Sequence, residues 1–297
     1  MKNIDLSSIT DAAVRSFSNL ESDRTRYLVQ ELVMSLHGYA KNVQLTHDEW
    51  RDALSFLHAC ADISSESRSE FSLLSDVLGV SSLVDLLAGK PGATPGSVLG
   101  PFHTDGSPWV NNPANLIGAN QGVPVIFRCQ VCDIQGNPLP SASIDYWQNA
   151  SNGLYWQVDS KQPTDNLRCQ LHVDAEGRFE ISTTRPVPYE IPTDGPVWRS
   201  LVQPAQRSSW RSAHAHVIVT APGYSTLVTE LFDSEDPYLN ADAVFGVRDE
   251  LVGIFKLKQD SELLTRHGMK GDECLVMDVV LKLSKSDEQA AAPALHL

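Results

Sequence analysis

Hydrophobic residues in the first part of the chain recur at helical spacing. Tyr27, Leu28, Leu32, Leu36 and Tyr39 are separated by one, three or four positions, so they form one apolar stripe along a helix. The pattern predicts an amphipathic helix whose apolar face packs in a core or against a second copy of the chain.

A second helix start signal follows at Thr46. Thr46 and Glu49 fit a capping box, in which the threonine hydroxyl and the glutamate carboxylate satisfy free backbone N–H groups. The apolar residues that follow on one face are Trp50, Leu54, Leu57 and Ala61. Two shorter helices are predicted over residues 71–78 and 83–87.

The hydrophobic period changes after a stretch rich in glycine and proline. Residues 88–96, AGKPGATPG, cannot continue a helix and mark a boundary. Beyond it Val125, Phe127, Cys129 and Val131 alternate with other residues, as in a strand with one face in a core. Further short strands are predicted over residues 142–148, 179–181, 217–220, 227–232 and 274–283. Many short strands separated by turn residues indicate a β-sandwich or a barrel.

These patterns together predict an α+β fold with two domains. A helical domain over residues 1–95 is expected to precede an antiparallel β-sandwich over residues 96–284. The remaining segment, residues 285–297, ends AAAPALHL and is expected to form a mobile tail.

Composition narrows the possible partners. The chain has 297 residues, of which 42% are hydrophobic and 20% charged, so one or two domains with real cores are expected. A formal net charge of -14 argues against binding to nucleic acid or to anionic membranes, because both require an excess of Lys and Arg. The chain shows neither a leader pattern nor an apolar run of about 18 residues, so a cytoplasmic location is expected.

The five cysteines do not form a disulfide pattern, because their number is odd and they are scattered. Cys129 and Cys132 form a C-x-x-C pair that could bind zinc or act in redox chemistry. They fall on a predicted strand, however, where residues three apart face opposite sides. We therefore expect reduced thiols in a core.

The first candidate for chemistry is the pair His214 and His216. On a strand, residues two apart project from the same face, so both imidazoles could bind one ion of Zn, Cu, Fe or Ni. Glu230, on a predicted neighbouring strand, would complete a ferrous site of two histidines and one carboxylate. Tyr155 and Tyr189 lie in loops and offer another ligand set.

Three motifs in order make the chain resemble the intradiol ring-cleavage dioxygenase family. They are G-x-Y at residues 153–155, R-P-x-x-Y-x-x-P at 185–192 and R-x-A-H-x-H-x-x-x-x-A-P-G at 211–223. Further matches are Gly-Pro-Phe at 100–102, Asp-Pro-Tyr-Leu at 236–239 and Phe-Gly-Val-Arg at 245–248. The resemblance extends from about residue 56 to residue 283.

The resemblance implies a non-haem Fe(III) ion bound by Tyr155, Tyr189, His214 and His216. A phenol with a pKa of about 10 ionises at neutral pH only when a Lewis acid binds it, which suits a ferric ion. The family opens aromatic 1,2-diols with O2 between the two hydroxyl-bearing carbons. Arg211 is expected to line the substrate pocket and to stabilise negative charge on the ring.

The resemblance also indicates the pocket walls. The expected substrate contacts are Leu73, Asp76, Val98, Leu99, Gly100, Pro101, Phe102, Ile191, Pro192 and Val247. Members of the family that act on hydroxyquinol carry Asp at the Asp76 position, where a carboxylate could accept a hydrogen bond from a third ring hydroxyl. The predicted reaction is hydroxyquinol (1,2,4-trihydroxybenzene) to maleylacetate, and the alternative is catechol to cis,cis-muconate. Asp76 could instead cap the turn before Gly79.

Four residues near the expected metal depart from the family pattern. Ser212 stands in place of Pro, His103 in place of Tyr, and Glu190 in place of Gly or Pro. Glu230 stands where Gln or His is usual, close to the metal, and a carboxylate there could change redox potential or ligand pKa values.

Two rival readings remain open at this point. One is a ferrous extradiol or cupin-type enzyme that uses His214, His216 and Glu230. The other is a β-sandwich binding protein with no activity. By the resemblance, the N-terminal helices are expected to form a homodimer interface, which could hold a lipid in an apolar channel.

Overall fold

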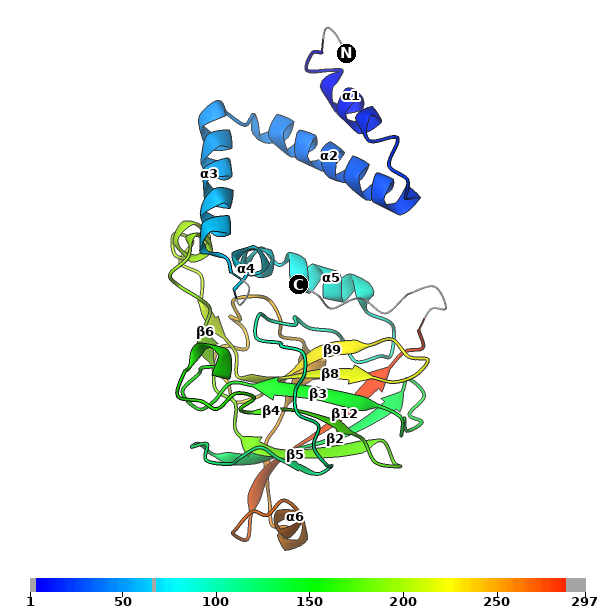
Figure 1. Ribbon diagram of the computed structural model, residues 1–297, viewed down its shortest axis with the longest axis vertical. Helices are drawn as coiled ribbons and strands as arrows, with labels where there is room; N and C mark the ends of the chain where they lie inside the picture. Colours follow the sequence, from blue (N-terminus) through cyan, green and yellow to red (C-terminus); the bar gives the residue numbers. More distant parts are fainter. Residues whose placement is uncertain (1–3, 66–67, 287–297) are drawn as a thin grey trace. The chain divides into compact units, whose positions relative to one another are not determined.

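A computed structural model describes residues 4–65 and 68–286 (Figure 1). The chain forms two compact units, Met1–Ala59 and Cys60–Leu297. Each unit is described by itself below. The predicted domain boundary near residue 95 stays a prediction, and the predicted tail lies outside the described residues apart from its first two positions.

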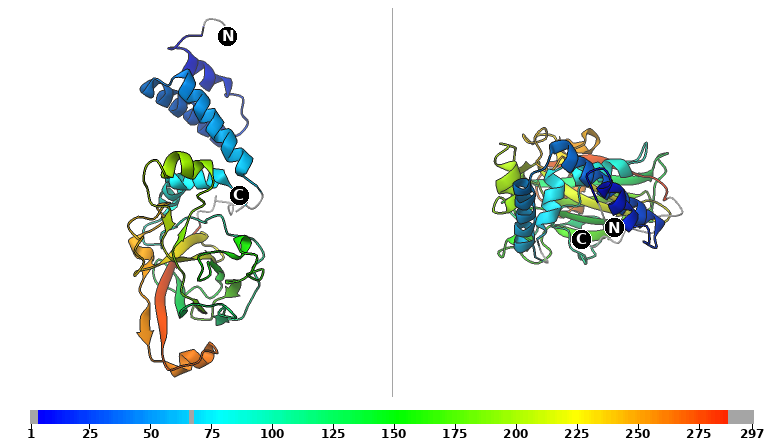
Figure 2. Two further views of the ribbon diagram at one scale, coloured as in Figure 1. Left: turned by 90° about the vertical axis from the view of Figure 1, so that its left-hand side faces the viewer. Right: turned by 90° about the horizontal axis from the view of Figure 1, so that it is seen from above.

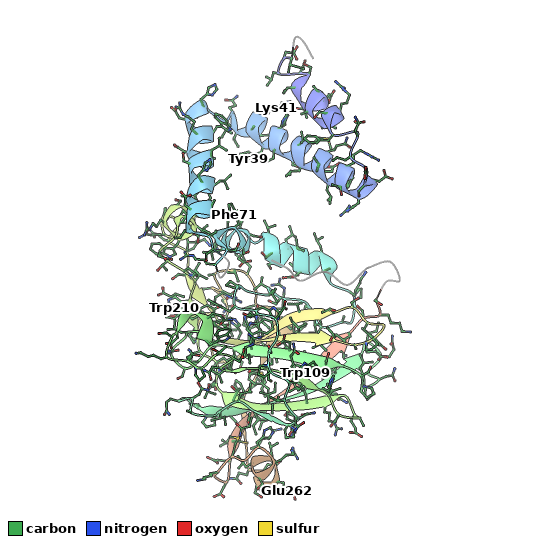
Figure 3. All side chains as sticks on the ribbon, in the orientation of Figure 1. Tyr39, Lys41, Phe71, Trp109, Trp210 and Glu262 are labelled. Carbon is green, nitrogen blue, oxygen red and sulfur yellow. The ribbon has the colours of Figure 1, made fainter. Side chains whose placement is uncertain are left out.

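The first unit is helical. Its elements are α1 (Ile9–Ser16), α2 (Asp23–Val43) and most of α3 (His47–Ile63). Helix α1, which the sequence pattern did not indicate, contacts α2 where the Lys41 ammonium donates a hydrogen bond of 2.8 Å to the Thr10 hydroxyl. Figure 3 labels Lys41 and Tyr39 on α2. The capping box is confirmed, because Thr46 N–H donates to the Glu49 carboxylate (2.9 Å) and Glu49 N–H donates to the Thr46 hydroxyl (3.3 Å).

Over its described residues, the second unit combines the end of α3 and three further α-helices with two five-stranded sheets and one strand pair. The helices are α4 (Glu70–Val77), α5 (Val80–Ala88) and α6 (Ser261–Arg266). The first sheet has the order β1 (Ala114–Asn115), β5 (Arg178–Thr184), β2 (Pro124–Asp133), β12 (Cys274–Leu283) and β11 (Lys256–Lys258). The second has the order β10 (Val252–Gly253), β9 (Leu227–Asp233), β8 (His214–Thr220), β3 (Ser143–Gln148) and β4 (Arg168–His172).

The remaining elements are short. Strands β6 (Tyr189–Glu190) and β7 (Trp210–Arg211) pair with each other, and single helical turns occur at η1 (Trp156–Val158), η2 (Trp198–Val202) and η3 (Asp249–Leu251). Figures 1 and 2 show α4 and α5 beside β9 and α6 at the opposite end of this unit.

The α+β class and the two-layer β architecture are confirmed, but the prediction of an antiparallel sandwich is wrong in one respect. Both large sheets are mixed, because β12 runs parallel to β2, β1 parallel to β5, and β10 parallel to β9. Strand β12 comes from the end of the chain and returns beside β2 in the same direction. Local alternation of apolar residues reveals a strand but not its neighbour or direction.

The core lies between the two sheets, and the central strands contribute alternate residues to it. On β2 these are Val125, Phe127, Cys129 and Val131, and on β8 they are Ala215, Val217 and Val219. The intervening residues of β8 therefore face away from the core. The described cysteines, Cys129 and Cys132 included, are free and buried, as expected of core thiols.

Among the described residues, no single helix is long and apolar enough to cross a membrane. Helices α4 and α5 together pass that test, but they bend by 71° at the break between them.

Candidate metal centre and adjoining pocket

The outer face of β8 carries the two histidines. His214 and His216 alternate with core residues Ala215 and Val217, so both imidazoles project from the opposite face. Their Nε2 atoms are 3.1 Å apart. Glu230 lies opposite His216 on β9, and its Oε1 is 3.3 Å from His214 Nε2. These three buried residues offer ligand atoms that all lie within 4.8 Å of one another, so they could hold a metal ion.

The two loop tyrosines reach the same place. Tyr155 directly precedes η1, and its hydroxyl is 3.4 Å from His214 Nε2. Tyr189 on β6 meets the Tyr155 ring edge to face, with centroids 5.6 Å apart, and its centroid is 5.6 Å from that of His214. Phe102 stacks on Tyr155 at 4.3 Å. The structure therefore brings together Tyr155, Tyr189, His214 and His216, which lie far apart in the sequence.

The protonation of the histidines suits a cation. Burial lowers the pKa of His214 to about 3, helped by the positive charge of Arg211, and lowers that of His216 well below its usual value. His214 Nδ1–H donates to the Ser212 carbonyl at 2.6 Å, which leaves the lone pair on Nε2. Two neutral imidazoles whose Nε2 atoms lie 3.1 Å apart are an arrangement that one bound metal ion would satisfy.

The tyrosines add a condition on that ion. Burial raises the pKa of Tyr155 well above its usual value, with a further contribution from Tyr189, and raises the pKa of Tyr189 to about 12. Both phenols therefore stay protonated at neutral pH unless a strong Lewis acid binds their oxygen atoms. The donor set fits a hard cation that can ionise two phenols.

Arg211 is fixed beside this cluster by two buried carboxylates. Its Nη2 donates to Glu230 Oε1 at 2.6 Å and its Nε donates to Asp242 Oδ1 at 3.0 Å. Burial opposes the charge of Arg211, but Asp242 and Glu230 raise its pKa well above the usual value. Burial raises the pKa of Glu230, against the effect of Arg211. Glu230, one of the four departures from the family pattern, therefore places a carboxylate between Arg211 and the histidines.

A cavity of about 150 Å³ adjoins the cluster. Of the predicted substrate contacts, those that border it are Leu73, Asp76, Pro101, Phe102, Ile191 and Pro192, together with Tyr189 and Arg211. Val98, Leu99, Gly100 and Val247 do not border it. Gly100 instead passes under His216, where a side-chain Cβ would lie 3.2 Å from the imidazole Cε1.

The cavity also has lining residues that the motifs did not indicate. They are Arg68, Ser69, Glu70, Val158 and Val244. Asp242 and Ser97, which hold Arg211 and Glu230 respectively, were missed as well. Asp242 lies three residues before the Phe-Gly-Val-Arg motif, and only the fold shows that its carboxylate returns to β7.

Asp76 faces the cavity from the last turn of α4. Burial raises the pKa of its carboxyl, against a hydrogen bond from Ser81 and the charge of Arg211. The turn before Gly79 is closed by the Asp76 backbone, since Gly79 N–H donates to the Asp76 carbonyl at 2.9 Å. The carboxylate itself therefore remains at the cavity.

Comparison with known proteins agrees with this geometry. Residues 98–282 match the family model described as Dioxygenase, and residues 22–94 match Catechol dioxygenase N terminus. The chain belongs to the intradiol ring-cleavage dioxygenase family and is an enzyme of that class.

Three relatives indicate the branch of the family. Hydroxyquinol 1,2-dioxygenase of Rhodococcus opacus is 40% identical, over 83% of this chain and 83% of that protein. An intradiol ring-cleavage dioxygenase of Aspergillus niger is 36% identical over 98% of this chain and 88% of its own length. The solved hydroxyquinol 1,2-dioxygenase of Pseudomonas putida has a TM-score of 0.84 and 39% identity, and the match covers 95% of this chain and 99% of that one.

Proposed function

We propose that the chain opens hydroxyquinol with O2 to give maleylacetate. The position of Asp76 supports hydroxyquinol as the substrate, because this residue lines the same cavity as Tyr189 and Arg211. A carboxylate can accept a hydrogen bond from a third ring hydroxyl, and a site built around such a bond discriminates strongly against a diol that lacks it. The relatives named hydroxyquinol 1,2-dioxygenase support the same substrate.

We further propose that Tyr155, Tyr189, His214 and His216 hold one Fe(III) ion. Bound there, the ion would draw electron density from the diol and make the ring reactive toward O2. The protein would supply neutral imidazoles, because burial keeps both histidines uncharged, and phenols that ionise only on binding. Buried aromatic rings around them exclude water from the ligand atoms.

Arg211 would stabilise negative charge that develops on the ring. Its guanidinium borders the cavity and is always charged, and Glu230 and Asp242 hold it in one orientation. A charge fixed in advance at a dry site costs little reorganisation during reaction. Leu73, Ile191 and Pro192 supply apolar contact for the ring.

The test of the substrate is oxygen consumption by iron-loaded enzyme on a panel of diols. A kcat/KM for hydroxyquinol about 30- to 150-fold above that for catechol is expected, because a lost hydrogen bond to a charged group costs about 2–3 kcal/mol. Faster turnover of catechol would contradict hydroxyquinol as the substrate and would favour cis,cis-muconate formation instead.

A second candidate site is a ferrous ion on His214, His216 and Glu230, because these three residues alone could hold a metal. Tyrosinate bound to Fe(III) should absorb visible light and colour the protein, whereas a ferrous site without tyrosinate should be nearly colourless. Loss of colour in Tyr189→Phe but not in Glu230→Gln would favour the ferric site. A colourless iron-loaded wild type that loses its iron in Glu230→Gln but keeps it in Tyr189→Phe would favour the ferrous one.

We also propose that the N-terminal unit mediates homodimerisation. The stripe residues Tyr27, Leu28, Leu32, Leu36 and Tyr39 are between 50% and 59% exposed, although they are apolar or aromatic. Light scattering on the wild type and on a Leu32→Glu, Leu36→Glu double variant tests this, with a dimer expected to become a monomer. Mass spectrometry of an organic extract would show whether a lipid is bound. A cytoplasmic location stays a prediction.

A further inference from the structure

We infer that Asp242 is a positioning residue that couples Arg211 to one wall of the diol pocket. The inference rests on the proposed function. One buried carboxylate holds the guanidinium with one oxygen and a pocket loop, residues 242–248, with the other. A change at Asp242 should therefore alter both the rate of ring opening and the choice of diol.

The first oxygen fixes Arg211. Asp242 Oδ1 accepts a hydrogen bond from Arg211 Nε at 3.0 Å and another from Ser212 N–H at 3.1 Å. Both donors precede the ligand His214 in the chain, so this contact also anchors the entry to β8. With Glu230 on Nη2, two of the three guanidinium nitrogens are held, and Arg211 still borders the cavity.

The second oxygen fixes the loop. Asp242 Oδ2 accepts a hydrogen bond of 2.8 Å from Gly246 N–H. A Cβ on Gly246 would lie 2.8 Å from Glu230 Oε2 and 3.0 Å from Arg211 Nη2. The loop backbone therefore passes directly over the ion pair, and a movement of either one displaces the other.

The loop also reaches the pocket helix. Val244 borders the cavity and is 2% exposed. Next to it, Arg207 donates to the Ala243 carbonyl at 2.9 Å and to the Val77 carbonyl of α4 at 2.6 Å. The wall that contacts substrate is therefore joined to Asp242 at one end and to α4 at the other.

Asparagine at this position cannot serve both sides. Its single carbonyl oxygen can accept from Arg211 and Ser212, or from Gly246, and its NH₂ group then faces a donor on the other side. Asp242→Asn is expected to lower kcat for hydroxyquinol about 10- to 100-fold and to lower the ratio of kcat/KM for hydroxyquinol over catechol at the same time.

A matched control separates this role from general stability. Asp133→Asn changes another buried aspartate, the last residue of β2, which accepts two backbone N–H groups of the turn that follows. It should cost stability in thermal unfolding but leave both kcat and the diol ratio unchanged. Arg207→Met should change the ratio more than it changes kcat, because it separates the loop from α4 while Asp242 still holds Arg211.

The experiment uses iron-loaded enzyme and a readout besides turnover. Diol affinity is titrated without O2 from the change in visible absorption, and iron content is measured for each variant. Asp242→Asn is expected to keep its iron and to lose its preference for hydroxyquinol in this titration as well. Unchanged kcat and unchanged diol ratio in an iron-loaded Asp242→Asn enzyme would overturn the inference.

A second variant covers the case in which Asp242→Asn does not fold. Asp242→Glu keeps the charge and both oxygens but displaces them by one methylene, so it should fold, bind iron and show an altered diol ratio. An unaltered ratio in Asp242→Glu would overturn the inference. A wild-type enzyme that cleaves no diol would instead overturn the proposed function, and the inference with it.

Discussion

The candidate metal centre and the pocket helix α4 are built in different ways. His214 and His216 are held on a central strand between β3 and β9, and each is at most 2% exposed. Helix α4 is only eight residues long, and the carboxylate of its Asp76 accepts a side-chain hydrogen bond from Ser81 on α5. The histidine half of the centre therefore shares the rigidity of the whole sheet, whereas α4, the wall of the cavity that carries Asp76, depends on a few local contacts.

This difference separates two properties of the enzyme. Changes at the centre should remove the reaction for every diol, because each ligand is needed whatever the substrate. Changes at the wall should alter which diol reacts while the reaction itself survives. Substitutions made first at the centre and then farther from it test whether the rate of ring opening and the choice of diol depend on different residues.

The largest effect is expected from Tyr189→Phe. Loss of one phenolate donor should lower kcat on all diols about 1,000-fold or more, the upper range for removing one electrostatic contact at a reacting centre. The visible absorption should weaken in parallel. Turnover and absorption of the iron-loaded variant check both expectations.

Tyr146→Phe is the matched control. Its hydroxyl donates to Gln148 in the core, away from the ligands, and its loss should cost about 1 kcal/mol of stability without changing the colour. If Tyr189→Phe kept full colour and turnover, the proposed ligand set would be wrong.

The sequence predicted the grouping of the four proposed ligands more completely than the lining of the cavity, for a physical reason. Two histidines on a strand must share a face, and the loop motifs named the tyrosines, so Tyr155, Tyr189, His214 and His216 could be grouped before the fold was known. The contacts of Asp242 and Glu70 depend on which distant backbone returns beside them. No local periodicity contains that information, and the parallel pairing of β12 with β2 was missed for the same reason.

At the wall, the largest effect is expected from Asp76→Leu. The variant removes the carboxylate that would accept the third hydroxyl, so the ratio of kcat/KM for hydroxyquinol over catechol should fall about 100-fold. Turnover of catechol by the same protein is the internal control, and it should change little or rise. An equal loss on both diols would mean that α4 contributes to the reaction and not to selectivity.

A smaller effect is expected where α4 is attached to the segment around Val197. Glu70 on α4 accepts a hydrogen bond of 3.0 Å from Val197 N–H, and a Cβ on Gly195 would lie 2.1 Å from Glu70 Oε1. Gly195→Ala should push the Glu70 carboxylate away from Val197 N–H and so loosen the start of α4. KM for hydroxyquinol should rise about 10-fold, equivalent to about 1.4 kcal/mol, with kcat changed much less.

The control for this change is Gly38→Ala, because an added Cβ there meets nothing within 4 Å. Steady-state kinetics on both variants measures the difference. A loss in kcat for Gly195→Ala that exceeds the rise in KM would show that the centre responds to the wall, and the separation of the two regions would fail.

The smallest effect is expected beyond the wall, at Asp85 on α5. Burial raises the pKa of this carboxyl to about 6, and the charge of Arg248 only partly offsets it. A folded-state pKa above the unfolded value means that ionisation destabilises the protein, so stability is lost as the pH rises from about 4 through 6. Asp85→Asn should therefore stabilise the protein by about 1 kcal/mol at pH 8, after allowance for partial exposure, and have almost no effect near pH 4.

Thermal unfolding at pH 4 and pH 8 measures the change in stability. Asp278→Asn is the comparison variant, and its effect on stability at pH 8 is expected to be the opposite. Arg128 and Lys258 pair with Asp278 and lower its pKa despite partial burial, so its ionised form stabilises the folded state at neutral pH. Removing that charge should lower the unfolding temperature at pH 8, where Asp85→Asn raises it. Turnover should be the same in both variants, because neither side chain borders the cavity. A pH-independent gain in Asp85→Asn would show that packing, and not the buried charge, limits stability at α5.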